Sequence, residues 1–417
     1  MEKNIVIVGA GYSGVLIAKK LAKHIKKRKI QDVYVTLIDK NPFHTMLTEL
    51  HEVAANRVEE DSVRLSLDKI FAGRKVNVVQ DTVSTIDYDN RQVIGEKGAY
   101  PYDYVVLAAG SKPTFFGVPG AEEYTYTLWS YEDAVKLKDH IHDCFRKAVM
   151  TTDMEEKKKL LHFDIVSAGF TGVEMTGELA EYVPILCESF GIDRELVTIR
   201  IIDMLTRTIP TLPEKLSYKV EKRLYKMGVQ ILLSTNVKSI GPDYIETEKE
   251  GEVSREYTGT VIWAAGIESA TLTCEVASTL PNAGRHRIKV DPYLRCVCSD
   301  NVYVAGDNMF YIPEGETQPV PQVVENCEQS AEIVAHNLLC AITETGEMKE
   351  YKPAFHGIMV SVGGRYGVAR VGGAKRKINL PSFFAMFCKH FINIVYFVQV
   401  LGWNKIFSYI KHEFFTI

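Results

Sequence analysis

The start of the chain carries the pattern that most constrains its fold, an apolar strand-like run that passes directly into a glycine-rich turn. Residues 5–8 are Ile-Val-Ile-Val, residues 9–14 are Gly-Ala-Gly-Tyr-Ser-Gly, and residues 15–22 have helix-forming composition. In such a strand–turn–helix unit the first glycine permits a tight turn, the second lets the backbone approach a pyrophosphate, and the third lets the helix pack closely on the strand. The sequence therefore predicts a dinucleotide site built on Gly9, Gly11, Tyr12, Ser13 and Gly14.

Two later strand ends complete this site. A second apolar run, residues 33–38, ends at an acid whose carboxylate is placed to accept hydrogen bonds from an adenosine ribose. A third, residues 104–107, ends in small residues that suit close approach of the backbone to a cofactor. A purely structural glycine turn is the alternative, but the flanking strands and the acid favour a nucleotide. The further contacts that we expect are Asp39, Lys40, Ala109 and Gly110.

The same order of features occurs a second time. Residues 163–179 repeat the strand, the glycine turn and the helix, the next apolar run ends at an acid, and a later run again ends in Ala-Ala-Gly. An internal repeat of this kind is stronger evidence than either motif alone. It predicts a second dinucleotide site formed by Gly169, Phe170, Thr171, Gly172, Asp203, Ala265 and Gly266.

Two residues qualify the second site. Ser167 stands where the first glycine of the motif belongs, and because serine rarely adopts a positive φ, the sequence leaves the exact turn geometry open there. The carboxylate of Asp203 would repel a 2′-phosphate, which favours NADH over NADPH, although Arg207 nearby leaves NADPH open.

The composition of the whole chain narrows the remaining classes. The 417 residues suffice for two or three domains, and a net charge of -4 gives no indication of nucleic-acid binding. The eight cysteines are scattered without a CxxC, so we expect reduced thiols, and the lone CxC of Cys296 and Cys298 is expected to be structural. His51 and Glu52 resemble the start of an HExxH zinc motif, but Ala55 replaces the second histidine, so no metal site is expected.

Turn-forming residues indicate where domains meet. Pro113 and Pro119 flank a crossover after the third strand end. We expect a discontinuous first domain of residues 1–113 and 287–345, a second domain of residues 114–286 inserted into it, and a C-terminal region of residues 346–417.

The opening apolar run is too short for a signal peptide, so we expect the protein to stay in the cytoplasm.

The C-terminal region is rich in aromatic residues. Residues 381–401 contain no uncharged run of about 20 residues, the length that a spanning helix needs. They instead place Lys389, His390 and Asn393 within one helical turn, opposite aromatic and aliphatic side chains, and residues 406–415 repeat the pattern. We predict a peripheral anchor on anionic lipid, with core or dimer-interface helices as the alternative. The cations just upstream are Arg370, Lys375, Arg376 and Lys377.

These patterns together resemble a known group. The paired fingerprints, both Ala-Ala-Gly strand ends and the run Tyr-Val-Ala-Gly-Asp at residues 303–307 resemble the two-dinucleotide-binding-domain flavoproteins of the glutathione-reductase type. Within that group, residues 169–179, the Pro-Gln pair at residues 321–322 and the apolar tail resemble the type II NADH dehydrogenases, which are single-subunit NADH:quinone oxidoreductases. The resemblance covers nearly the whole chain. It implies an α/β fold with two Rossmann-like domains, the second inserted in the first, and a membrane-associating C-terminal region.

The resemblance also implies which cofactor occupies each site. FAD would occupy the first site, with its pyrophosphate near Ala109 and Gly110, and NADH would occupy the second as co-substrate. In this family an acid at the position of Asp307 binds the ribityl chain of the flavin, and the segment at Gln322 lines its isoalloxazine ring. The additional FAD contacts implied in this way are Val83, Gly306, Asp307, Gln322 and Val323.

Four residues are expected to act in catalysis: Glu174, Gln322, Asn326 and Lys389. In this family a glutamate at the position of Glu174 reaches the nicotinamide and the flavin; the alternative is a solvated carboxylate favoured by the helix dipole. Lys389 matches a lysine near the quinone pocket, with a snorkelling surface lysine as the alternative. The family's Ala-Gln-x-Ala-x-Gln stretch here reads Pro-Gln-Val-Val-Glu-Asn, so Gln322 is retained and Asn326 replaces the second glutamine, which leaves the quinone type open.

We therefore predict an FAD-dependent NADH:quinone oxidoreductase at the cytoplasmic face of the membrane, as a possible homodimer. It would pass a hydride from NADH to FAD and two electrons to a quinone, with a menaquinone favoured, without pumping protons. One alternative is a soluble NADH-dependent flavoprotein that acts on oxygen, peroxide or an electron-carrier protein, and another is a non-catalytic flavoprotein that senses NADH. No cysteine pair follows the first fingerprint, which argues against a disulfide reductase.

Overall fold

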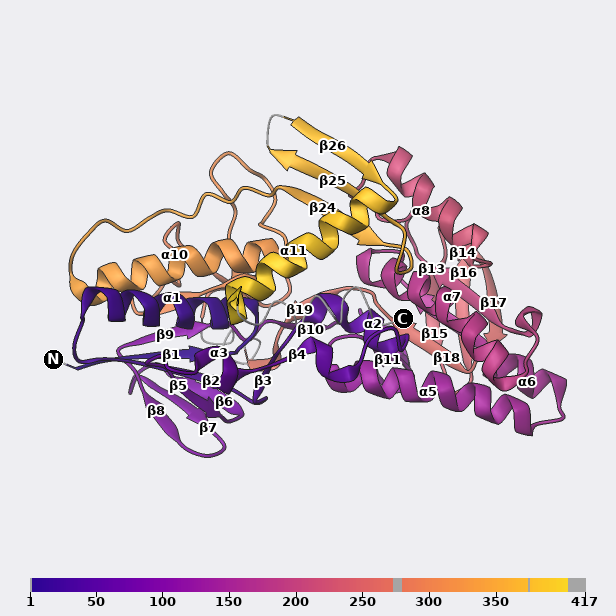
Figure 1. Ribbon diagram of the computed structural model, residues 1–417, viewed down its shortest axis with the longest axis horizontal. Helices are drawn as coiled ribbons and strands as arrows, with labels where there is room; N and C mark the ends of the chain where they lie inside the picture. Colours follow the sequence, from indigo (N-terminus) through magenta and orange to yellow (C-terminus); the bar gives the residue numbers. More distant parts are fainter. Residues whose placement is uncertain (1, 273–279, 374–375, 404–417) are drawn as a thin grey trace. The chain divides into compact units, whose positions relative to one another are not determined.

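The computed structural model describes residues 2–272, 280–373 and 376–403. The chain forms two compact units, each assembled from three stretches of sequence. The first unit comprises Met1–Thr45, Arg64–Lys112 and Ile267–Phe355, and the second comprises Met46–Val63, Pro113–Gly266 and His356–Ile417. The elements of both are labelled in Figure 1.

The first unit is built on a five-stranded parallel sheet. Its central strand β1 (Lys3–Val8) has four consecutive buried apolar residues, which is the composition that a strand covered on both faces requires. Helices α1 (Tyr12–Arg28) and α10 (Val324–Thr343) pack side by side (Figure 1). The strand order is β22-β9-β1-β2-β5, with β22 (Val302–Val304), β9 (Tyr104–Leu107), β2 (Val33–Asp39) and β5 (Asn77–Gln80).

Smaller sheets and short helices complete the first unit. The antiparallel group β6-β7-β8 consists of β6 (Val83–Asp87), β7 (Gln92–Gly95) and β8 (Ala99–Pro101), and a mixed group consists of β20 (Asn282–Ala283), β21 (Arg287–Lys289) and β23 (Met309–Phe310). Two paired sets are β3 (Phe43–Thr45) with β4 (Arg64–Ser66), and β10 (Ser111–Pro113) with β19 (Ile267–Ser269). The short helices are α3 (Leu67–Phe71) and η4 (Gly306–Asn308).

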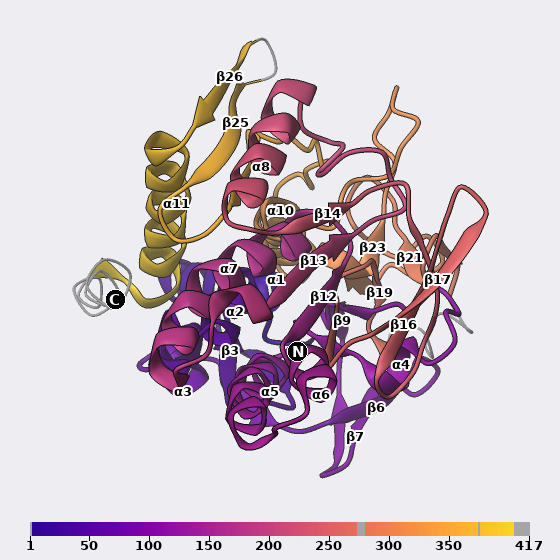
Figure 2. The same cartoon turned by 90° about the vertical axis from the view of Figure 1, so that its right-hand side faces the viewer.

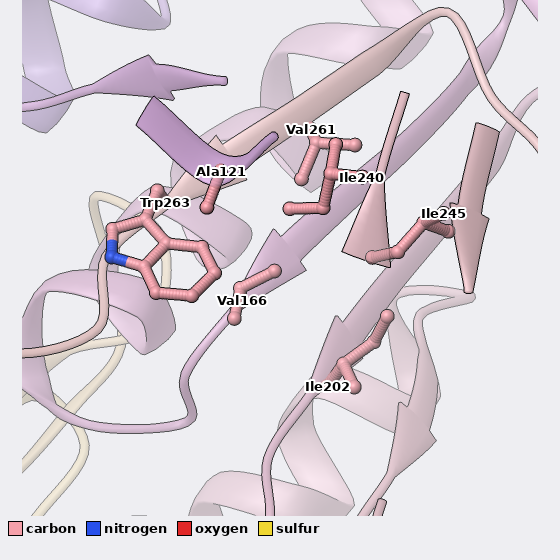
Figure 3. Packing of buried hydrophobic residues seen from close by; sticks show 7 residues of the cluster. All are labelled: Ala121, Val166, Ile202, Ile240, Ile245, Val261 and Trp263. Atoms are coloured by element: carbon pink, nitrogen blue, oxygen red, sulfur yellow. The ribbon is translucent and has the colours of Figure 1, made fainter. Parts of the chain in front are cut away.

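The second unit repeats the five-stranded parallel sheet, in the order β11-β18-β12-β13-β14. Its central strand β12 (His162–Val166) is buried throughout and leads into α7 (Phe170–Phe190). Figure 3 shows the apolar cluster at the carboxyl ends of these strands, where Trp263 packs with Ala121 and Val166. The other strands are β11 (Tyr126–Thr127), β13 (Thr198–Ile202), β14 (Gln230–Leu232) and β18 (Thr260–Trp263).

Further helices and two separate antiparallel sheets belong to this unit. The helices are η1 (Leu47–Glu49), α2 (Leu50–Ala54), η2 (Glu60–Val63), α4 (Ala121–Tyr124), α5 (Tyr131–Met150), α6 (Met154–Leu160), η3 (Arg194–Leu196) and α8 (Glu214–Lys226). One antiparallel sheet consists of β15 (Asn236–Ile240), β16 (Tyr244–Lys249) and β17 (Glu252–Tyr257). The other consists of β24 (Gly357–Ser361), β25 (Gly367–Gly373) and β26 (Arg376–Pro381), and α11 (Phe383–Leu401) packs along it (Figure 2).

The fold class matches the expectation, but the expected domain limits differ at three points. The chain returns to the first unit at residue 267, not 287, because β19 pairs with β10 and β20 pairs with β21. Most of the expected C-terminal region of residues 346–417 falls in the second unit, which includes residues 356–417. Residues 46–63 also belong to the second unit, where α2 packs on α5 and α7. Lys375 and residues 406–415 of the expected anchor lie outside the described residues.

Candidate functional site

The turn after β1 has the backbone geometry of a dinucleotide turn. Gly9 has a φ of 102°, which an L side chain rarely adopts, and a Cβ at Gly14 would overlap the carbonyl oxygen of Gly9. Gly11 differs, because nothing lies within 4 Å of the position that its Cβ would take. Gly9 and Gly14 therefore serve the fold, while Gly11 leaves open space at the N-terminus of α1, where free N–H groups favour a phosphate.

Asp39 joins the end of β2 to this turn. Its Oδ2 accepts a hydrogen bond of 2.6 Å from the backbone N–H of Ala10, and its Oδ1 accepts one of 2.8 Å from the N–H of Asn41. Burial raises the pKa of Asp39, and the two backbone N–H groups oppose that rise. The carboxylate thus lies beside the glycine turn, as a ribose-binding acid must.

A second acid lies at the end of β22, in the same unit. Asp307 Oδ2 accepts a hydrogen bond of 2.6 Å from Ser111 Oγ, and burial raises the pKa of Asp307. The buried side chain of Asn308 bridges the neighbouring strand end, because its Oδ1 accepts from the Gly110 N–H at 2.9 Å and its Nδ2 donates to the Gly110 carbonyl at 2.5 Å. Sequence reasoning missed Ser111 and Asn308, which hold the strand ends in place.

Gln322 and Asn326 have separate roles. The Nε2 of Gln322 donates to the carbonyl oxygen of Asp307 at 3.1 Å, so Gln322 adjoins the second acid. Asn326 is buried, its Nδ2 donates to the Gly306 carbonyl, and its Oδ1 accepts from Tyr351 Oη at 2.7 Å. Both polar groups of Asn326 thus support the backbone and a core tyrosine, and its expected part in catalysis stays a prediction.

The other residues expected around the first site differ in exposure. Tyr12 is buried with its ring edge-on to His44, and Ser13 Oγ donates to the Cys327 carbonyl at 3.1 Å. These two residues therefore shape the turn from inside the unit. Lys40 and Val323 are exposed, while Val83 and Ala109 are half-buried.

The turn after β12 reproduces the first one despite its serine. Ser167 has a φ of 94°, close to that of Gly9, and a Cβ at Gly172 would overlap the Ser167 carbonyl oxygen just as Gly14 would overlap that of Gly9. The turn geometry that the sequence left open is therefore that of the first turn. Local hydrogen bonds hold the serine there: its Oγ accepts from the Gly169 N–H at 3.2 Å and lies 3.5 Å from Asp203 Oδ2.

Asp203 repeats the contacts of Asp39. Its Oδ2 accepts from the Ala168 N–H at 2.6 Å, and its Oδ1 accepts from the Leu205 N–H at 2.8 Å. The glycine of the second Ala-Ala-Gly, Gly266, has a φ of 70°, and the ring of Phe116 covers the position of its missing Cβ. Phe116 is 59% exposed, so this ring is an additional side chain at the second turn that sequence reasoning missed.

The remaining residues expected at the second site surround the N-terminus of α7. Phe170 begins that helix, and Thr171 is exposed within its first turn. Ala265 is half-buried, and its carbonyl oxygen accepts from Trp263 Nε1 at 3.0 Å. The structure therefore gathers this predicted set within one unit.

A buried ion pair lies one helical turn further along α7. Glu174 Oε1 accepts a hydrogen bond of 2.9 Å from Lys389 Nζ on α11. Ser361, at the end of β24, donates to the same carboxylate oxygen through Oγ at 3.0 Å and through its backbone N–H at 3.2 Å. Gly177 makes this approach possible, because a side chain there would meet the backbone of Val362.

The protonation states of the pair follow from its surroundings. Burial, the largest single cause, would raise the pKa of Glu174, but the Lys389 ammonium and the other groups around the carboxylate together outweigh burial and lower the pKa. Burial, the largest single cause, would lower the pKa of Lys389, but the carboxylates of Glu174, Glu49 and Glu52 together outweigh burial and raise the pKa. Both groups are therefore charged at neutral pH. The alternatives of a solvated carboxylate and a surface lysine are wrong, because only 14% of the Glu174 side chain and 10% of that of Lys389 are exposed.

Comparison with known proteins finds relatives along most of the chain. The model of the pyridine nucleotide-disulphide oxidoreductase family matches residues 3–331. The type II NADH:quinone oxidoreductase of Staphylococcus aureus is 30% identical over 372 residues, which are 89% of this chain and 90% of that protein. The structure of NDH2 from Plasmodium falciparum in complex with NADH has a TM-score of 0.87 at 19% identity and covers 100% of this chain and 99% of that one.

A further solved structure has the same fold. The sulfide:quinone oxidoreductase from Aquifex aeolicus has a TM-score of 0.74 at 17% identity and covers 100% of this chain and 96% of that one. At these identities the solved structures show the shared fold.

Proposed function

Because the chain belongs to the pyridine nucleotide-disulphide oxidoreductases and, within them, to the type II NADH:quinone oxidoreductases, we propose that it is an FAD-dependent enzyme that oxidises NADH and reduces a membrane quinone. The observation that carries this proposal is the pair of turns with the same geometry, each closed by an acid that accepts a backbone N–H.

The first unit fits FAD. Gly11 leaves room for a pyrophosphate, and the carboxylates of Asp39 and Asp307 lie at strand ends where ribose and ribityl hydroxyls would need acceptors. Gln322 adjoins Asp307 and would lie near the flavin ring. When bound, FAD accepts a hydride from NADH and returns two electrons to the quinone.

The second unit fits NADH. The N-terminus of α7 would take the pyrophosphate, and Asp203 would accept hydrogen bonds from the ribose hydroxyls. A 2′-phosphate would meet this carboxylate, so NADPH is disfavoured. Arg207, which could have attracted such a phosphate, donates through Nη2 to the Pro210 carbonyl at 2.5 Å.

We assign the Lys389–Glu174 pair to the quinone. A quinone carbonyl gains negative charge and a proton on reduction, so a charged N–H donor beside it lowers the barrier. Lys389 is that donor, Glu174 keeps it charged, and Ser361 fixes the carboxylate.

The membrane contact is assigned to α11. One face of this helix packs inside the second unit, whereas the side chains of the other face are about half exposed or more. By length and composition α11 is the one described helix that could cross a membrane, but its buried Lys389 favours a helix that lies in the cytoplasmic surface of the bilayer. The exposed face consists of Phe383, Phe384, Phe387, Phe391, Ile392 and Val395.

The function is tested by anaerobic turnover of the FAD-loaded protein. We expect rapid oxidation of NADH by a menaquinone analogue, slower oxidation by a ubiquinone analogue, and little activity with NADPH. Replacement of Glu174 by glutamine should slow quinone reduction by about 100-fold without loss of FAD. The replacement removes the charge that keeps Lys389 protonated, and loss of one hydrogen-bond donor that stabilises a transition-state charge commonly costs about that much. Turnover with oxygen but with neither quinone would contradict the proposal and favour a soluble oxidase.

A further inference from the structure

An aromatic side chain in the second unit has a backbone conformation that its residue type rarely adopts. Phe116 has a φ of 51°, and Gly117 after it has a φ of 72°. The Val118 N–H donates to the Phe115 carbonyl at 3.0 Å, so residues 115–118 form a β-turn whose two central residues both have positive φ. This is the type I′ pattern, in which asparagine, aspartate or glycine usually takes the first central position. A phenylalanine there costs conformational energy that some other interaction has to offset.

Core packing does not provide that interaction. Phe116 is 59% exposed, whereas the ring of Phe115 lies 5.8 Å from that of Trp263, a member of the apolar cluster in Figure 3. The Phe116 ring instead rests on Gly266, where its Cζ lies 2.3 Å from the position that a Cβ would take. Part of the ring therefore covers the end of β18, and the rest faces solvent. Strain that packing does not offset is typical of ligand-binding positions.

The turn is fixed to the strand end that its ring covers. Trp263 Nε1 donates to the Thr114 carbonyl at 2.9 Å and to the Ala265 carbonyl at 3.0 Å. The Thr114 N–H also donates to the Gly266 carbonyl at 3.4 Å. The Phe116 ring is therefore positioned before any ligand binds, which limits the entropy that binding would cost.

The strand order indicates which part of a dinucleotide would lie beside this ring. In the order β11-β18-β12-β13-β14, the glycine turn follows the central strand β12, and Asp203 and Gly266 follow its two neighbours, β13 and β18. A dinucleotide binds across such a reversal of strand order, with its adenosine ribose at the acid and its pyrophosphate at the glycine turn. Its other half, which bears the nicotinamide, would then extend over the end of β18, where Phe116 lies.

We propose that the Phe116 ring packs against the nicotinamide riboside half of NADH and makes the second unit selective for NADH over adenosine nucleotides that lack this half. This inference rests on the proposed function and names a specificity-determining residue for its first step. The contact is non-covalent: the exposed part of the ring offers an apolar surface on which a sugar or a pyridine ring can pack or stack.

The proposal is tested by calorimetric titration of the FAD-loaded chain with two ligands. One is 1,4,5,6-tetrahydro-NAD, an NADH analogue that cannot donate a hydride, and the other is ADP-ribose, which lacks the nicotinamide. Phe116→Asn should weaken binding of the analogue by about 3- to 10-fold, the effect of one aromatic contact, and that of ADP-ribose by less than about 2-fold. The matched control Tyr257→Asn, which removes a 63% exposed ring from β17 of the same unit, should change neither affinity.

Three binding results would overturn the proposal. Equal weakening of both ligands in Phe116→Asn would place the ring at the adenosine half or in the fold. Unchanged binding of the analogue would remove the contact. Tighter binding of the analogue would show that the ring obstructs the dinucleotide.

Thermal unfolding separates a role in binding from a role in the fold. Phe116→Asn should unfold at a temperature no lower than that of the wild type, because asparagine favours the first central position of a type I′ turn. Phe116→Tyr keeps the ring and should bind the analogue as the wild type does. A Phe116→Asn variant that unfolds at a lower temperature or fails to fold would assign the ring to the fold and overturn the proposal.

Stopped-flow kinetics separate this inference from the function on which it rests. Phe116→Asn should raise the NADH concentration that gives half-maximal flavin bleaching by the same factor as the affinity. It should leave unchanged the oxidation of chemically reduced flavin by a menaquinone analogue. A wild-type chain that NADH does not bleach would overturn the function together with the inference. A wild-type chain that NADH bleaches, with Phe116→Asn indistinguishable from it, would overturn the inference alone.

Discussion

Ser167 holds a φ of 94° at a position where the first turn uses a glycine. A non-glycine residue in this region costs about 1–3 kcal/mol, which the surrounding structure must offset. The Gly169 N–H and the nearby Asp203 carboxylate provide that support through the serine hydroxyl. The spacing of the motif was therefore a better guide to the turn than the conformational preference of the residue.

The roles of residues that lie on one short segment could be predicted from the sequence. The roles of residues that act through tertiary contacts could not. Gly9 and Gly14 follow from the motif because their neighbours lie close in sequence or at the next strand end. Asn308 and Ser361 hold backbone or carboxylate atoms of residues far away along the chain, at Gly110 and Glu174, so no local pattern marks them.

At the level of single residues, we expect alanine substitutions of Gly11 and Gly14 to have different effects. Gly11→Ala should fold with little loss of stability, because its Cβ meets nothing, yet it should lose FAD because the Cβ enters the pyrophosphate space. Gly14→Ala should be destabilised by several kcal/mol, roughly 2 or more, because the Cβ overlaps the Gly9 carbonyl. Thermal unfolding of the apo forms and FAD content separate the two. Equal losses in both variants would contradict the assignment of Gly11.

Among the helices and strands, α11 shows which structural features a sequence pattern can predict and which it cannot. Its helical character and aromatic face follow from residues 381–401 alone. The inward direction of Lys389 and Asn393 depends on acids contributed by α7 and η1, since Asn393 Nδ2 donates to Glu49 Oε1 at 2.8 Å. The sequence did not predict that residues 46–63 join this unit.

The exposed face of α11 predicts binding to anionic vesicles. Phe387 and Phe391 are 55% and 56% exposed, and burying two phenyl rings in the bilayer interface should raise partitioning by at least about 10-fold. Flotation of the Phe387→Ser/Phe391→Ser variant should therefore fall well below that of the wild type. The matched control is Tyr218→Ser/Tyr225→Ser, which removes two exposed rings from α8 and should float normally. Equal flotation of the wild type and both double variants would show that α11 is not the anchor.

At the scale of the whole molecule, one chain contains the same strand–turn–helix architecture twice, in two units with the same parallel sheet arrangement. The repeat and the fold class could be read from the sequence because each copy is local. The limits of the units could not, because the pairing of β19 with β10 and the packing of α2 on α7 join distant segments.

We propose that the two sites hold FAD and NADH and that electrons pass from NADH to a quinone. An anaerobic spectroscopic titration of the protein measures both binding and electron transfer. We expect one FAD per chain, bleaching of the flavin absorbance by one equivalent of NADH, and full recovery on addition of one equivalent of a menaquinone analogue. A colourless protein that takes up no FAD, or a bleached flavin that quinone leaves bleached, would contradict the account.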